Sequence, residues 1–81
     1  MYRWGFLDAL RHLFLTGRVR RRGWNGSGMW LEVEWPDARS TLTHPFVVIV
    51  YPAGHPAYPA GSRIPWEASR TDLFADDWEQ C

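Results

Sequence analysis

The chain has 81 residues and no net charge, because nine basic residues balance nine acidic ones. It is too short for several domains, and a neutral chain lacks the positive excess of proteins that coat long nucleic acid. An isolated chain of this length buries only about 60–65% of its unfolded surface. We therefore expect one domain over residues 1–81, stabilised by homo-oligomerisation, to which six tryptophans are suited.

The only cysteine is the last residue, Cys81, so an intrachain disulfide is excluded and a cytoplasmic location is expected. Asp8 and Arg11 interrupt the apolar N-terminal stretch, which argues against a signal peptide. The longest apolar run, residues 46–51, is too short to span a bilayer, so no membrane partner is expected.

The first predicted element is an amphipathic helix over residues 4–16. Its apolar residues recur at helical spacing and predict the core-facing stripe: Leu7, Leu10 and Phe14, widened by Phe6 and Leu13. Gly17 stands where a glycine commonly ends a helix.

Two strands are predicted next. Residues 18–22 form a short strand with Val19 facing inward and Arg18 and Arg20 outward. Residues 29–35 alternate cleanly and predict a half-buried antiparallel strand, which ends at Pro36.

Residues 20–28, between these strands, form the most informative segment. Three arginines lead into a loop with three glycines, Trp24 and Asn25. Guanidinium groups suit phosphate oxygens, glycines permit close approach, and an indole stacks on bases. The segment therefore predicts a nucleotide-type pocket. The alternative is a strand of exposed arginines that ends in an ordinary Asn-Gly turn, with a core tryptophan.

Residues 42–51 predict a further strand, apolar on both faces, that is either central or at a subunit interface. The tetrad Tyr-Pro-Ala-Gly then occurs twice, at 51–54 and 58–61, and predicts two turns in a protruding loop.

The tail contains a second predicted helix. Ser69 followed by Asp72 is typical of a helix N-terminus, so we expect a helix over residues 70–76 with Leu73 and Phe74 turned inward. Trp78 then lies in a final extended segment as a core residue. The predicted fold class is α+β: a small antiparallel sheet with an N-terminal helix and a short C-terminal helix.

Trp24 and Trp66 are the predicted aromatic walls of the pocket. Trp66 precedes the Ser69 helix start, whose free N–H groups could seat an anion. The alternative for Trp66 is a packed residue. The carboxylates at positions 72, 76, 77 and 79 fit a helix start and a solvated turn better than catalysis, and the histidines lack metal-ligand spacing. We expect no enzyme, no metal and no cofactor.

Several motifs together resemble a known family. They are Phe6-Leu7-Asp8-Ala9-Leu10, Arg22-Gly23-Trp24-Asn25-Gly26 after Gly17, Met29-Trp30-Leu31, and an ending with Pro65-Trp66, Ser69, Asp72-Leu73, Ala75 and Asp77-Trp78. The chain resembles, over nearly its whole length, the second type of Thoeris anti-defence protein of phages.

This resemblance implies a homotetramer without catalysis that sequesters glycocyclic ADP-ribose, a signal made by a TIR-domain enzyme in the host cytoplasm. Some members also bind cyclic di- or trinucleotides at a separate site. By position, the ligand-binding residues would be Arg22, Trp24, Asn25 and Gly26 of the glycine loop, and Trp66, Ser69 and Asp72 of the final motif. Two departures bear on ligand identity: Ser27 replaces a common lysine, and residues 51–61 are rich in proline.

The sequence thus predicts a sponge for a cyclic nucleotide immune signal. Two alternatives remain. A small nucleic-acid-binding module would use Arg18 to Arg22, although nucleic acid is not the expected partner, and a structural phage protein would use its tryptophans only at interfaces.

Overall fold

The structure is a computed structural model that describes residues 4–15, 17–24, 28–37 and 43–81. Its elements are α1 (Phe6–Phe14), β1 (Val19–Arg21), the 3-10 helix η1 (Arg22–Trp24), β2 (Trp30–Glu34), β3 (Phe46–Val50), β4 (Arg63–Pro65), α2 (Arg70–Phe74) and β5 (Trp78–Gln80). The predicted strands at 18–22 and 29–35 are confirmed with somewhat shorter bounds, and the final extended segment at Trp78 is the strand β5.

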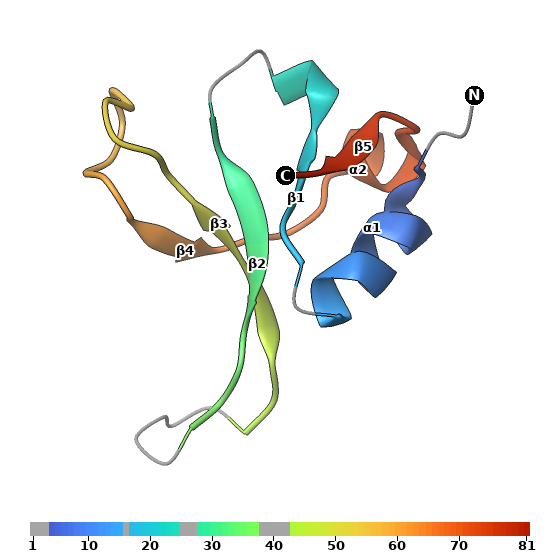
Figure 1. The fold of residues 1–81 in the computed structure, drawn as a ribbon, viewed down its shortest axis with the longest axis horizontal. Coiled ribbons are helices and arrows are strands. Elements are labelled where there is room, and N and C mark those ends of the chain that lie inside the picture. Colours follow the sequence, from blue (N-terminus) through green and yellow to red (C-terminus); the bar gives the residue numbers. More distant parts are fainter. Residues whose placement is uncertain (1–3, 16, 25–27, 38–42) are drawn as a thin grey trace.

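The strands form one antiparallel sheet in the order β4-β3-β2-β1-β5. One row of apolar residues crosses it, because Val19 pairs with Leu31, Leu31 with Ile49, and Ile49 with Ile64. Figure 1 shows α1 and α2 together beside β1 and β5, while β4 and the loop that precedes it lie at the other side. The predicted α+β class with two short helices is confirmed.

The predicted core stripe of α1 is wrong in part. Leu13 is buried together with Ala9, whereas Leu7 and Phe14 are 79% and 47% exposed. Ala9 and Leu13 lie one turn apart, and the small Ala9 allows the helix to approach the sheet closely. Neither α1 nor any other helix in the described ranges is long and apolar enough to cross a membrane.

β3 is an interior strand between β2 and β4, and its residues Val48, Ile49 and Val50 are buried. This agrees with the first of the two predicted alternatives, a strand inside the sheet. The sequence did not predict β4, which has only three residues. Pro65 cannot donate to a ladder, so an edge strand is where it is tolerated.

The loop between β3 and β4 confirms the two predicted turns. Gly54 and Gly61, the last residues of the two tetrads, have φ angles of 83° and 78°. Glycine takes these left-handed angles without steric cost. The Tyr51 and Tyr58 rings are in contact, with centroids 4.5 Å apart and planes tilted by 43°, which ties the two tetrads together.

The inward orientation predicted for α2 is wrong. Leu73 is 44% exposed and Phe74 is 87% exposed, whereas Asp72 is buried. A helix of five residues can turn only one face toward the rest of the chain. That face carries Asp72, because a guanidinium from β1 holds its carboxylate there, as described below.

Candidate functional site

A surface pocket of about 240 Å³ lies where β1, η1 and β5 meet the segment leading into β2. It is lined by Arg20, Arg21, Arg22, Trp24, Gly28, Met29 and Glu79. Gly28 has a φ of 79°, and a Cβ atom there would lie 3.0 Å from Pro52. Glycine therefore lets the segment before β2 close one side of the pocket. The other walls combine guanidinium groups, an indole and one carboxylate.

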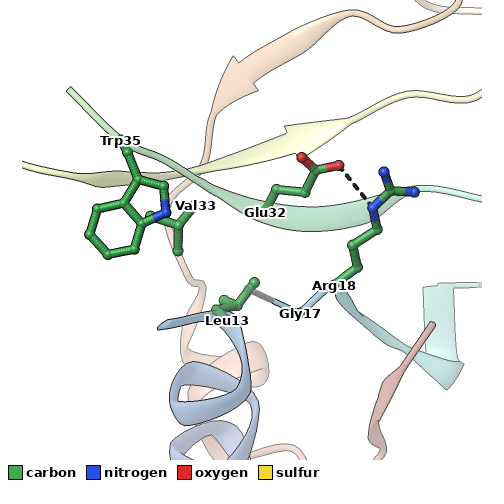
Figure 2. A pocket seen from close by; sticks show the side chains of 6 residues that line it. All are labelled: Leu13, Gly17, Arg18, Glu32, Val33 and Trp35. Atoms are coloured by element: carbon green, nitrogen blue, oxygen red, sulfur yellow. Dashed lines mark ion pairs between the residues drawn. The ribbon is translucent and has the colours of Figure 1, made fainter. Parts of the chain in front are cut away.

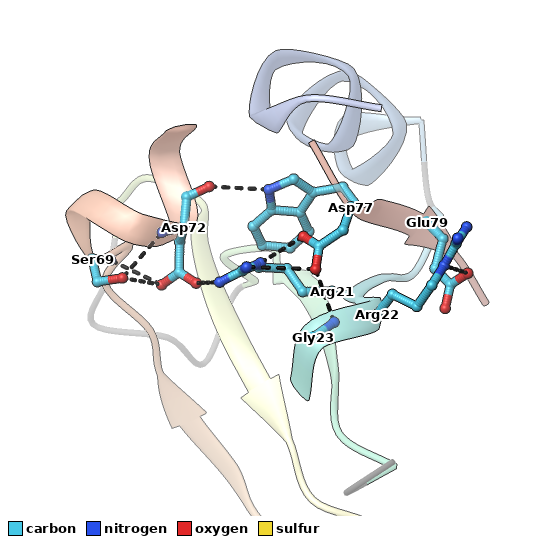
Figure 3. Close-up of polar contacts among 8 residues, drawn as sticks. Arg21, Arg22, Gly23, Ser69, Asp72, Asp77 and Glu79 are labelled. Carbon is cyan, nitrogen blue, oxygen red and sulfur yellow. Dashed lines mark hydrogen bonds and ion pairs between the residues drawn. The ribbon is translucent and has the colours of Figure 1, made fainter. Parts of the chain in front are cut away.

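Arg21 connects the pocket to the C-terminal part of the chain (Figure 3). Its Nη1 donates to Asp72 Oδ1 at 3.0 Å, and its Nε donates to Asp77 Oδ1 at 2.8 Å. The three side chains are 16%, 12% and 28% exposed, respectively. These ion pairs join β1 to α2 and to the residue before β5. Because they are largely shielded from water, they are costly to break.

Asp77 also fixes the backbone that leads into the glycine loop. The Gly23 N–H donates to Asp77 Oδ2 at 2.8 Å, and the Arg22 N–H donates to the Asp77 carbonyl at 3.0 Å. A Cβ atom at Gly23 would lie 2.8 Å from the same carboxylate oxygen. Glycine at position 23 therefore permits the hydrogen bond that orients η1 and Trp24.

Ser69 caps α2 as predicted, and its own polar groups bond within the chain. The Ser69 N–H and Oγ donate to Asp72 Oδ2 at 2.9 Å and 2.8 Å, and the Asp72 N–H donates to Ser69 Oγ at 3.1 Å. The negative charge at this helix start is the Asp72 carboxylate itself. The Ser69 groups that were expected to help seat an anion thus already bond to Asp72.

Replacing Ser69 by alanine is expected to lower the free energy of unfolding by about 1–2 kcal/mol, because both the cap and a hydrogen bond to Asp72 are lost. Chemical denaturation measures this change. Thr71→Ala, on the exposed side of the same helix, is the control and should change stability by less than about 0.5 kcal/mol. Equal effects of the two variants would contradict the capping role.

The network lowers the pKa values of both of its carboxylates, Asp72 and Asp77. Burial opposes ionisation of Asp72, but hydrogen bonds from Ser69 and then from Arg21 outweigh it and hold the pKa of Asp72 below its usual 3.8. The hydrogen bond from Arg21 is the main cause of the lowered pKa of Asp77. The hydrogen bond to Asp77 is likewise the main cause of the raised pKa of Arg21.

The remaining arginines of the segment are also paired. Arg18 Nε lies 3.2 Å from Glu32 Oε2 and Arg20 Nε lies 3.1 Å from Glu79 Oε1. Arg22 Nε lies 3.5 Å from Glu79 Oε2. The sequence predicted these arginines to be free to bind phosphate. The structure adds that every guanidinium group from β1 and η1 already faces a carboxylate.

Four aromatic rings pack behind the pocket. The Trp24 and Trp78 rings meet edge to face with centroids 5.6 Å apart, and Trp66 lies 6.4 Å from Trp24 and 6.0 Å from Trp78. Phe6 of α1 completes the group at 5.7 Å from Trp78. Trp78 is buried, as predicted, and its Nε1 donates to the Asp72 carbonyl at 3.1 Å.

A family model for the Thoeris anti-defense 2-like domain matches residues 5–81. The chain belongs to this family. Membership gives it a Thoeris-inhibiting role in general and confirms the resemblance inferred from the motifs. A search of curated proteins gave no match.

The predicted site residues of this Thoeris anti-defense 2-like chain divide into three groups. Arg22 and Trp24 line the pocket. Trp66, Ser69 and Asp72 do not line it: Trp66 packs against Trp24, and the other two belong to the Arg21 network. Asn25 and Gly26 lie outside the described residues, as does Ser27.

Sequence reasoning missed Glu79 and Met29 as pocket residues. The sequence pattern places Glu79 in a solvated turn, and Met29 only in the strand over residues 29–35. The position of Glu79 opposite Arg20 in the β1–β5 pair brings it to the pocket. No local sequence signal specifies that pairing.

A second pocket of about 280 Å³ lies at the C-terminal end of α1 (Figure 2). Leu13, Val33 and Trp35 form its apolar wall, and the Arg18–Glu32 ion pair lies at its other end. The Trp35 ring meets Phe14 edge to face at 6.0 Å. This pocket has an aromatic side chain but only one guanidinium, which makes it a weaker candidate for a phosphate-bearing ligand.

The stability of the domain is expected to fall on acidification below about pH 4 and to be unaffected by these carboxylates between about pH 5 and 7. A carboxylate whose folded pKa is depressed stabilises the fold above its unfolded pKa, and this contribution is lost as the pH falls through the folded pKa. Urea denaturation at a series of pH values measures the effect. Asp77→Asn should show a shallower decline; an identical pH profile would contradict the assignment.

Proposed function

We propose that this chain is a non-catalytic sponge that binds a cyclic nucleotide immune signal in the pocket of Arg20–Arg22, Trp24 and Met29, and so blocks Thoeris defence in the infected host cell. The observation that carries the proposal is the pairing of several guanidinium groups with an indole in one pocket. Guanidinium groups bind phosphate, and an indole stacks on a base. Glycocyclic ADP-ribose, which has both features, is the proposed signal, and cyclic di- or trinucleotides are further ligands.

The chemistry of the pocket favours binding over catalysis. Its described lining residues are arginine, tryptophan, glycine, methionine and glutamate. Glu79 is already paired with two arginines, Arg20 and Arg22. A sponge works by mass action and needs nanomolar affinity, on the order of −12 kcal/mol. Stacking contributes about 1–3 kcal/mol per base and charge-assisted hydrogen bonds about 1.5–3 kcal/mol each.

The size of the pocket favours a site shared between chains. At about 240 Å³ it falls below the roughly 300–1,000 Å³ of typical small-molecule sites. One protomer therefore accommodates only part of a cyclic ADP-ribose. We propose a homotetramer in which a second copy completes the site. Exposed apolar side chains such as Leu7, Leu15 and Phe74 are suited to subunit contacts.

The nucleic-acid alternative is weakened by the same ion pairs. Each of the arginines from Arg18 to Arg22 faces a carboxylate, so the segment offers little net positive charge to a phosphate backbone. Binding of single-stranded oligonucleotides with a steep salt dependence would restore that alternative.

Native mass spectrometry tests the proposal directly. The purified protein is mixed with glycocyclic ADP-ribose and with a panel of cyclic di- and trinucleotides, and bound molecules are then released by heat. We expect a tetramer that retains a signal and returns it unchanged. An altered product would indicate an enzyme. A stable oligomer that retains none of these molecules would contradict the sponge and leave the structural role.

A further inference from the structure

Glu79 occupies the pocket in the way that a bound anion would. Its two oxygens are divided between two arginines: Oε1 lies 3.1 Å from Arg20 Nε, and Oε2 lies 3.5 Å from Arg22 Nε. All three side chains line the same pocket. A carboxylate that joins two guanidinium groups presents two oxygens at the spacing with which a phosphate would meet them.

The two kinds of arginine in the pocket differ in how firmly they are held. Arg21 is 16% exposed and is bound by two shielded carboxylates, Asp72 and Asp77. Arg20 and Arg22 are 46% and 72% exposed, and among the residues that the structure describes they share one carboxylate, Glu79. Exposed ion pairs contribute little net stability and exchange readily with other ions, whereas shielded pairs are costly to break. An incoming anion can therefore compete for Arg20 and Arg22 but not for Arg21.

We infer that Arg20 and Arg22 form the phosphate subsite of the pocket and that Glu79 is its internal counter-ion, which a ligand phosphate must displace. The inference rests on the proposed function and deepens it. The cost of displacing Glu79 offsets much of the binding free energy that a phosphate group gains from Arg20 and Arg22. A phosphate that carries no ring to stack on Trp24 therefore binds poorly. Glu79 thus makes the pocket selective for phosphate that is joined to a base, against free inorganic phosphates.

The test compares Glu79→Gln with the wild-type oligomer by isothermal titration calorimetry, with inorganic pyrophosphate and with glycocyclic ADP-ribose as probes. Glutamine keeps the size and hydrogen-bonding oxygen of glutamate but removes its charge. We expect pyrophosphate to bind about 3- to 10-fold more tightly to Glu79→Gln, as removal of one nearby like charge in a solvated pocket predicts. The gain should shrink as salt is added.

Glu34→Gln is the matched control. It also removes one carboxylate, but that carboxylate pairs with Arg63 at 2.8 Å and does not line the pocket. Its affinity for both probes should equal that of the wild type. Adding Arg22→Gln to Glu79→Gln should abolish the gain, which locates it at this subsite. Thermal melting confirms folding, and Glu79→Ser provides a second neutral variant if Glu79→Gln is unstable.

The outcomes separate the two claims. If the wild type retains the cyclic nucleotide but both neutral variants bind the probes no more tightly than the wild type, Glu79 is not a counter-ion and the sponge still stands. If the gain in Glu34→Gln equals that in Glu79→Gln, the effect is one of net charge and the inference fails. If neither the wild type nor the folded variants bind either probe, and the wild type also retains no cyclic di- or trinucleotide, both the inference and the proposed function fail.

Discussion

Replacing Arg21 by methionine is expected to lower the free energy of unfolding by about 2–4 kcal/mol. The substitution keeps much of the packing volume but leaves Asp72 and Asp77 charged, shielded and without their guanidinium partner. A domain of this length has a total stability of only about 4–12 kcal/mol, so a large part of it would be lost. Urea denaturation followed by circular dichroism measures the change.

The control for this prediction is Arg63→Met. Arg63 also pairs with two carboxylates, Glu32 and Glu34, but its side chain is 36% exposed and lies on the edge strand β4. Its loss should cost no more than about 1 kcal/mol, because exposed pairs contribute little. Arg21→Lys should recover only part of the stability, since one ammonium group cannot reproduce the planar fork that meets both aspartates. Equal losses for Arg21 and Arg63 would contradict the network.

Replacing Trp24 by alanine is expected to weaken binding of the cyclic nucleotide by about 10- to 100-fold while the oligomer stays intact. Trp24 is the only aromatic residue among the described lining of the pocket, and one stacked base is worth about 1–3 kcal/mol. Calorimetric titration measures the affinity, and native mass spectrometry reports the assembly. Unchanged affinity in the alanine variant would place the pocket elsewhere.

Two further tryptophans serve as comparisons. Trp35→Ala removes a 51% exposed indole from the second pocket and should leave the affinity unchanged. Trp66→Ala should also weaken binding, but through lost packing against Trp24 and Trp78, so its melting temperature should fall as well. Trp66→Phe, which keeps an aromatic ring behind Trp24, should retain most of the affinity. If Trp66→Phe binds as poorly as Trp24→Ala, Trp66 contacts the ligand directly.

The site depends on a contact between segments that are far apart in the sequence. Arg21 lies 51 residues from Asp72 and 56 from Asp77, yet one guanidinium joins both carboxylates. Through Asp77 the same network holds the Gly23 N–H and hence the start of the glycine loop. The two motifs that characterise the chain, around Trp24 and around Ser69, thus form one structural unit in which the C-terminal part holds the start of the glycine loop.

Local patterns in the sequence determined the elements whose physical causes are short-range. Alternation predicted β2 because successive strand residues point to opposite faces, and the Ser69–Asp72 spacing predicted the α2 cap because its partners are three residues apart. Trp78 could be assigned to the core from its size and apolar character. The family resemblance depended on such motifs as well.

Only the tertiary structure decided which charges meet. The pairing of β1 with β5 places Glu79 opposite Arg20 and Trp78 opposite Arg21, and a shift of one residue would have reversed these faces. No periodicity in the sequence specifies that register, because β1 and β5 lie near opposite ends of the chain. This is why the sequence indicated Arg22 and Trp24, which line one pocket, but could not show that Glu79 pairs with the arginines there or that Asp72 accepts hydrogen bonds from Ser69.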